Sequence, residues 1–184
     1  MTCLQTKDFL DVVETDETWG TGTMKNSVGV HQWNPHNLTL SSEDFSSSDW
    51  VKTDTTVTSN AAMAPDGTLT ADKISHTSTT AEIFQALTIT NGLTYAGGVC
   101  LKYVDHQWLR LSYDSSAVWV DLQNGVLGTD TTNGATLTDL GDGWLYLHSS
   151  EEAIGSIWGY SATLVTADAS TTETSGTSAY IWGA

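Results

Sequence analysis

Basic residues are scarce in this chain of 184 residues, which carries 6 Lys and Arg against 22 Asp and Glu and has a formal net charge of −16 at pH 7. None of the basic residues lies beyond Arg110. A chain with this charge is repelled by phosphate backbones and by anionic lipids, so we expect no nucleic acid and no membrane among its partners. The same acidity favours solubility, and it suits a basic partner surface or Ca²⁺.

Cysteine, proline and long hydrophobic runs are also rare. The two cysteines, Cys3 and Cys100, form neither a disulfide framework nor a zinc-binding spacing. We expect Cys100, in the apolar stretch VCLKYV, to be a buried free thiol, with a Cys3–Cys100 bridge as the alternative. We also expect no signal peptide and no membrane span, because no apolar stretch has the required place or length.

Threonine, serine, glycine, asparagine and aspartate are abundant, which is typical of strands joined by turns. From Asn37 onward, apolar and polar residues alternate in short segments such as WLRLSY at 108–113 and WLYLHS at 144–149. We interpret NLTLSSEDFSSSDW at 37–50 as the opening strand of this region, and the polar stretch 166–178 as a long loop. The pattern predicts an all-β fold over residues 37–184, either a sandwich or a jelly roll.

Residues 1–36 lack sustained periodicity but are not uniformly polar. An exposed segment with this much apolar surface usually docks on something, either its own domain or a partner. We therefore predict an extended N-terminal attachment arm that binds a partner. Its candidate contact residues are Phe9, Leu10, Val12, Val13, Trp19, Val30 and Trp33.

The region from Asn37 to Ala184 resembles a jelly-roll domain of phage structural proteins that is itself similar to carbohydrate-binding modules. Seven blocks carry the resemblance in order: NLTLSSEDFSSSDWVK at 37–52, APDGTLTADKI at 64–74, GLTYAGGVCLK at 92–102, WLRLSY at 108–113, VWVDLQNGVLGT at 118–129, LGDGWLYLHSS at 140–150 and AYIWGA at 179–184. The resemblance covers about four fifths of the chain, and it implies a two-sheet antiparallel jelly-roll sandwich.

The resemblance implies a virion protein, because such domains occur on capsid exteriors and tail fibres. An arm followed by one compact domain suits a capsid decoration (cement) protein on the capsid exterior. Its expected partners are the major capsid protein and further copies of itself, in a homotrimer. The alternative is a tail-associated carbohydrate-binding or host-adhesion module that binds host-surface glycans.

Sugar binding requires aromatic faces that stack on pyranose rings. The candidates are Trp108, Tyr113, Trp119 and Trp158. The competing interpretation is that such rings fill the core of a sandwich, and we assign Trp144 and Trp182 to packing. Trp119 alternates with Val118 and Val120, so we expect it to face away from them and to be exposed.

Catalytic residues are not predicted, because adjacent carboxylates such as Glu151 and Glu152 point to opposite faces of a strand. We therefore expect a protein that is not an enzyme. The resemblance implies one further site, since jelly-roll binding modules often hold a structural Ca²⁺ near the first strand. The acidic residues in the matching region are Glu43, Asp44 and Asp72.

Overall fold

The computed structural model describes residues 23–25, 31–33, 37–113, 116–132 and 134–184, the first two ranges by their backbone only. Strands β1 (Thr23–Lys25) and β2 (His31–Trp33) pair antiparallel, with Trp33 opposite Thr23. The other candidate arm residues lie outside the described ranges. These are Phe9, Leu10, Val12, Val13, Trp19 and Val30.

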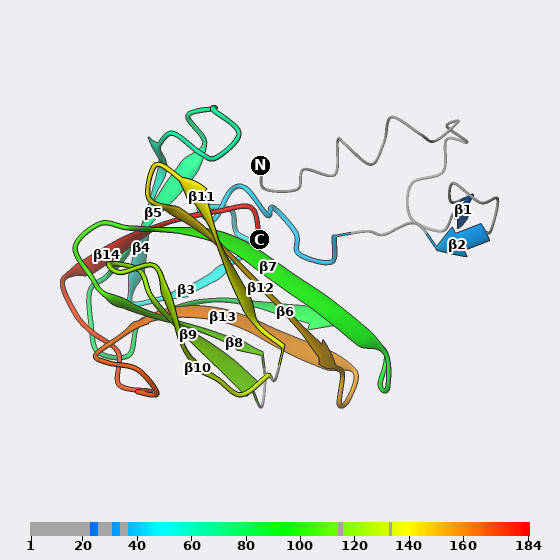
Figure 1. Ribbon diagram of the computed structural model, residues 1–184. Helices are drawn as coiled ribbons and strands as arrows, with labels where there is room; N and C mark the ends of the chain where they lie inside the picture. Colours follow the sequence, from blue (N-terminus) through cyan, green and yellow to red (C-terminus); the bar gives the residue numbers. More distant parts are fainter. Residues whose placement is uncertain (1–22, 26–30, 34–36, 114–115, 133) are drawn as a thin grey trace.

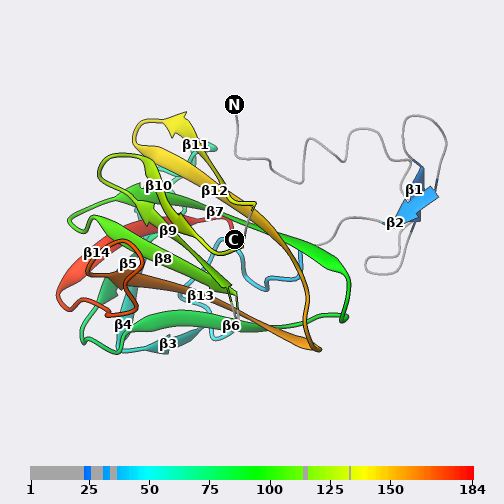
Figure 2. The same cartoon turned by 60° about the horizontal axis from the view of Figure 1, so that its bottom comes forward.

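Two six-stranded antiparallel sheets pack face to face as a sandwich (Figures 1 and 2). The first sheet has the order β10 (Val126–Asp130), β9 (Ser116–Asp121), β8 (Trp108–Tyr113), β13 (Ile157–Val165), β6 (Glu82–Thr88) and β3 (Val51–Thr53). The second has the order β11 (Thr136–Gly141), β12 (Trp144–Glu152), β7 (Thr94–Tyr103), β14 (Thr177–Trp182), β5 (Ala71–His76) and β4 (Thr55–Ala62). The chain crosses between the sheets repeatedly, as in a jelly roll, so the predicted fold class is confirmed. Within the described ranges, no helix has the length and apolar character needed to span a membrane.

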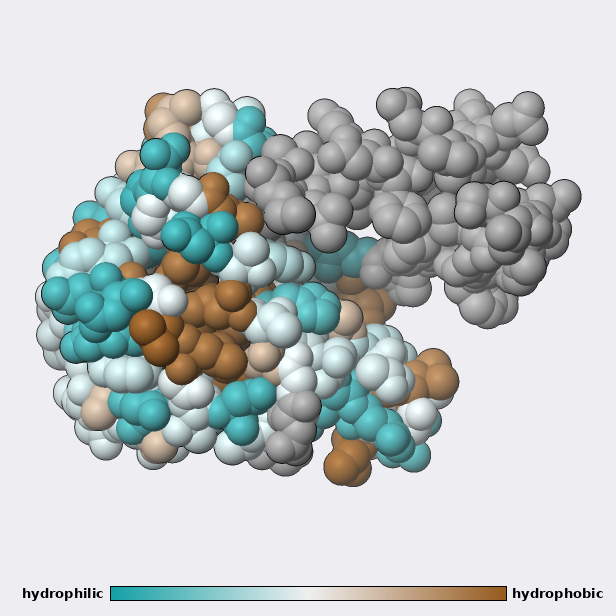
Figure 3. Space-filling model, in the orientation of Figure 1, coloured by the Kyte–Doolittle hydropathy of each residue, from teal (hydrophilic) through white to brown (hydrophobic). Residues whose placement is uncertain are grey.

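Alternation along each strand decides which side chains enter the core. On β12, Leu145 and Leu147 join the large cluster between the sheets, whereas Trp144 joins a smaller cluster on the other face of the second sheet. Each large aliphatic side chain buried between the sheets contributes about 1.5–3 kcal/mol relative to an exposed one. The face of the sandwich shown in Figure 3 is mostly hydrophilic, with apolar residues gathered in one patch.

The segment 37–50 is not the opening strand that the sequence predicted, because it folds as a series of turns. Its polar side chains bond to the local backbone: Asn37 Oδ1 accepts the N–H of Thr39 at 3.0 Å, and Asp44 Oδ1 accepts the N–H of Ser46 at 3.0 Å. Asparagine, aspartate and serine side chains form such local hydrogen bonds with the backbone, and these compete with the hydrogen bonds between β-strands. Phe45 and Trp50, both buried, anchor the segment in the core.

A tight turn joins β4 to β5, where proline and glycine favour the required backbone angles. The Ala64–Gly67 turn closes with a hydrogen bond from the Gly67 N–H to the Ala64 carbonyl at 3.0 Å, and Gly67 has a φ of +85°. The predicted long loop is confirmed between β13 and β14. Gly98 allows a close approach, since a Cβ there would lie 2.5 Å from the Tyr146 hydroxyl.

Cys100 is not the free thiol that the sequence predicted. The structure has it disulfide-bonded, and it is fully buried on the outer side of the second sheet, in the cluster with Trp144 and Trp182. The chain's other cysteine, Cys3, lies outside the described residues.

Candidate functional site

Two of the four candidate sugar-binding rings lie in the core between the sheets. Tyr113 is 1% exposed and Trp158 is 5% exposed, and their rings stack on each other with centroids 5.0 Å apart. Burial raises the pKa of Tyr113, whose hydroxyl accepts a hydrogen bond from Ser149 Oγ at 2.8 Å. Neither ring offers a face to a ligand, so the packing interpretation holds for both.

Trp119 faces away from Val118 and Val120 as predicted, but the expectation that it is exposed is wrong. It is 6% exposed, because the loop between β13 and β14 covers it. The indole Nε1 donates to the Ser170 carbonyl at 2.7 Å, and the Arg110 guanidinium lies 5.5 Å from the ring centroid. This cover depends on contacts remote in sequence.

Trp108, on the same outer face of the first sheet, is half-buried against Trp119. Asp168 of the covering loop lies beside it: its carboxylate accepts the Thr129 N–H at 2.7 Å, and a Cβ on Gly128 would meet both Asp168 and Trp108. Of the four candidate rings, Trp108 is the one that is not buried.

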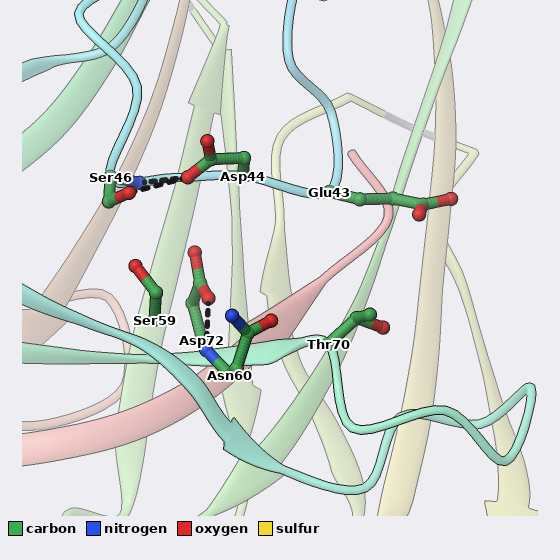
Figure 4. A pocket seen from close by; sticks show the side chains of 7 residues that line it. All are labelled: Glu43, Asp44, Ser46, Ser59, Asn60, Thr70 and Asp72. Atoms are coloured by element: carbon green, nitrogen blue, oxygen red, sulfur yellow. Dashed lines mark hydrogen bonds between the residues drawn. The ribbon is translucent and has the colours of Figure 1, made fainter.

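The three candidate calcium ligands line one polar pocket of about 330 Å³ (Figure 4). The other lining residues are Ser46, Ser59, Asn60 and Thr70. Asp44 and Asp72 come from the turn segment and from β5, whereas Glu43 points away from both. The sequence therefore predicted a neighbourhood that the fold does form.

Asp72 is 2% exposed and holds two backbone segments in place. Its Oδ2 accepts the Phe45 N–H at 2.8 Å, and its Oδ1 accepts the Asn60 N–H at 2.9 Å. Burial raises the pKa of Asp72, the charge of Asp44 raises it further, and the two N–H bonds oppose the change. Its carboxylate thus has a structural task in this pocket.

Glu43, Asp44 and Asp72 do not form a cluster of three acidic side chains. No group of three or more His, Cys, Asp or Glu side chains within the described ranges is arranged to hold a metal ion. The reason lies in the local geometry: Glu43 turns outward, and both Asp72 oxygens are engaged by N–H groups.

A row of side chains that the sequence analysis missed crosses the outer face of the second sheet. Lys73, Tyr180, Lys102 and Trp144 are successive register partners on β5, β14, β7 and β12. Alternation within each segment could have placed each residue on a face. It could not show that the four lie in line, because the strand order and register come from pairings distant in sequence.

The beginning and the end of the sandwich are fastened together. Asn37 Nδ2 donates to the Ala184 carbonyl at 2.9 Å, and the Ala184 N–H donates to the Ser42 carbonyl at 3.0 Å. The residues before Asn37 therefore join the sandwich at a fixed point beside its last strand.

Neither the known protein families nor the curated proteins compared with this chain include a match.

Proposed function

We propose that this protein is a non-catalytic virion component that decorates a phage capsid. In this proposal residues 1–36 bind the outer surface of the major capsid protein, and the sandwich is displayed on the exterior. Copies associate as a homo-oligomer, with a trimer as the expected state.

The observation that carries the proposal is the fastening of Asn37 to Ala184. It gives the preceding segment a fixed origin on a rigid body, which is what a tether between a shell and a displayed domain requires. The ordered resemblance of seven sequence blocks to phage jelly-roll domains supplies the expected location.

The stabilising effect would be mechanical. Apolar side chains of the segment would bury area between capsid subunits, at about 25 cal/mol per Å² before the cost of association. Roughly 300 Å² per copy would then give several kcal/mol, multiplied over many copies.

Binding to purified particles tests the proposal. Full-length protein should co-sediment with DNA-filled heads, and a truncation lacking residues 1–36 should not, while its circular dichroism stays that of a β-sandwich. A full-length Cys100→Ser variant is the matched control, because the truncation also removes Cys3. Equal binding by the truncated protein would overturn the attachment role.

Glycan binding is the second candidate, and it is favoured by Trp108 alone among the four rings. Polysaccharide pull-down that is lost in Trp108→Ala but kept in Tyr103→Ala would support it. Tyr103 is a suitable control because it is an aromatic ring at the end of β7, 37% exposed and on the other sheet.

A further inference from the structure

Cys100 lies at the centre of the outer face of the second sheet. Its neighbours in sequence, Val99 and Leu101, point into the core, and its register partners across the sheet are Tyr146 on β12 and Trp182 on β14. Cys100 is disulfide-bonded, and the sequence contains one other cysteine, at position 3. The first residues of the chain are therefore the natural candidates to cover this face.

The same face carries two lysine cations. Lys73 and Lys102 flank Tyr180, each as its direct register partner. Neither forms an ion pair with a described carboxylate, and Lys102 Nζ lies 5.7 Å from the centroid of the Trp144 ring. In a chain of net charge −16, these two lysines form a local positive region that an acidic segment would complement.

An apolar hollow of about 450 Å³ opens at one end of this row. Trp144, Leu140 and Met63 line it together with two charged residues, Lys102 and Asp142, and Met63 is 55% exposed. The occupant that fits such a surface combines apolar and acidic side chains.

We propose that the chain's own residues 1–17 dock on this face, tethered by a Cys3–Cys100 disulfide. Residues 8–17, DFLDVVETDE, combine four large apolar side chains with five acidic ones. Asp8 follows Cys3 by five residues, which span up to about 17 Å when extended, and Lys102 follows Cys100 by only two. The acidic groups therefore reach Lys73 and Lys102, and the apolar groups reach the hollow.

This docking does not rest on the capsid proposal, but it narrows the part of residues 1–36 that is free to bind a capsid. It covers residues 9–13 in the free protein and leaves the stretch from Trp19 to Trp33 for an external contact. In this proposal, the first part of the chain lies folded back on the sandwich before any partner binds.

Mass spectrometry of purified, unreduced protein tests the tether. Alkylation of the denatured protein should modify neither cysteine, and the non-reduced digest should contain a peptide linking positions 3 and 100. Two alkylated thiols, or a disulfide-linked dimer, would overturn the proposal, the latter by making a second copy the occupant.

Zero-length carbodiimide cross-linking then tests the docking itself in the Cys3→Ser variant, where no tether biases the result. Cross-links from Asp8, Asp11, Glu14, Asp16 or Glu17 should join Lys73 or Lys102 at least fivefold more often than Lys52. Lys52 is the reference because it lies on β3 of the other sheet. Its Nζ donates to backbone carbonyls of residues 45–50, so each yield is divided by the yield at the same lysine in the urea-unfolded protein. Equal yields at all three lysines would show that the segment does not settle on this face.

Discussion

At the scale of single residues, His76 links the two sheets through its imidazole ring. The ring is 1% exposed on β5, and its Nε2 accepts the Leu164 N–H of β13 at 3.4 Å. Nδ1 therefore carries the proton and donates to the Thr174 carbonyl at 3.3 Å. This tautomer holds the β13–β14 loop, the same loop that covers Trp119.

Protonation of His76 should destabilise the protein. Burial lowers the pKa of His76 to about 4, the Thr174 carbonyl opposes this, and His106 adds to it. Because the folded pKa lies below the unfolded value of about 6.5, the contribution of the neutral ring is complete above pH 6.5 and is lost as the pH falls toward 4. Over the full interval from pH 6.5 to pH 4, this protonation lowers the unfolding free energy by roughly 3 kcal/mol.

Urea unfolding at several pH values measures this effect. Between pH 7 and pH 4.5 the parent should lose about 2–3 kcal/mol more unfolding free energy than His76→Gln, which cannot be protonated there. Parallel pH profiles for the two proteins would contradict the assignment.

Asp72 offers a second test at the residue scale. Asp72→Asn places an amide N–H₂ against a backbone N–H donor, so we expect a loss of about 1–3 kcal/mol in unfolding free energy. Asp44→Asn is the matched control, because Asp44 is exposed and its Oδ1 acceptor is retained; it should change stability by less than about 0.5 kcal/mol. Equal effects of the two substitutions would count against the structural role of Asp72.

At the scale of elements, period-two alternation predicted most strands and the facing of Trp119 correctly. It failed at 37–50, where Leu38 and Leu40 alternate with polar residues but Asn37 and Asp44 bond to the backbone instead. The local sequence pattern does not show whether the backbone bonds to these side chains or to a neighbouring strand, because that depends on whether a partner strand is present.

The exposure of Trp119 was unpredictable for a related reason. Its cover comes from Ser170, 51 positions away, and no pattern around Trp119 indicates that contact. The acidic pocket was partly predictable, since Asp44 and Asp72 were named together through the resemblance. Whether their oxygens face N–H groups or a cation depends on backbone geometry that the sequence does not reveal.

Gln85 on β6 clamps the turn segment onto the first sheet. Its Oε1 accepts the Leu40 N–H at 2.8 Å, and its Nε2 donates to the carbonyls of Leu40 and Asp49 at 3.1 and 3.2 Å. Gln85→Leu leaves these groups unpaired, so we expect a loss of about 2–4 kcal/mol and faster amide hydrogen exchange at 40–49.

The exposed Gln123→Leu is the matched control for this clamp and should change stability by less than about 0.5 kcal/mol. If exchange at 40–49 in Gln85→Leu stayed at the parent rate, the clamp would not be what holds the segment.

At the scale of the whole molecule, the net charge of −16 sets the response to salt. Self-repulsion among surface carboxylates destabilises the compact state, and salt screens it, since the Debye length falls from about 30 Å at 0.01 M to about 8 Å at 0.15 M. We expect the melting temperature to rise by about 2–5 °C between these concentrations of NaCl, measured by differential scanning calorimetry.

Calcium chloride at the same ionic strength provides the control. No group of three or more acidic side chains among the described residues is arranged to hold Ca²⁺, so we expect its effect to match that of NaCl within about 2 °C. A fall in melting temperature with salt would contradict the repulsion argument, and a much larger rise with calcium would reveal a specific site.

The bond between Asn37 and Ala184 has a consequence for protein engineering. Because the two ends of the sandwich meet, a short linker could join them, and new termini could be opened in an exposed turn without crossing the core. For the same reason the domain could be inserted into a surface loop of a host protein, with both junctions side by side. The sandwich is therefore suited to circular permutation and to use as a grafted module.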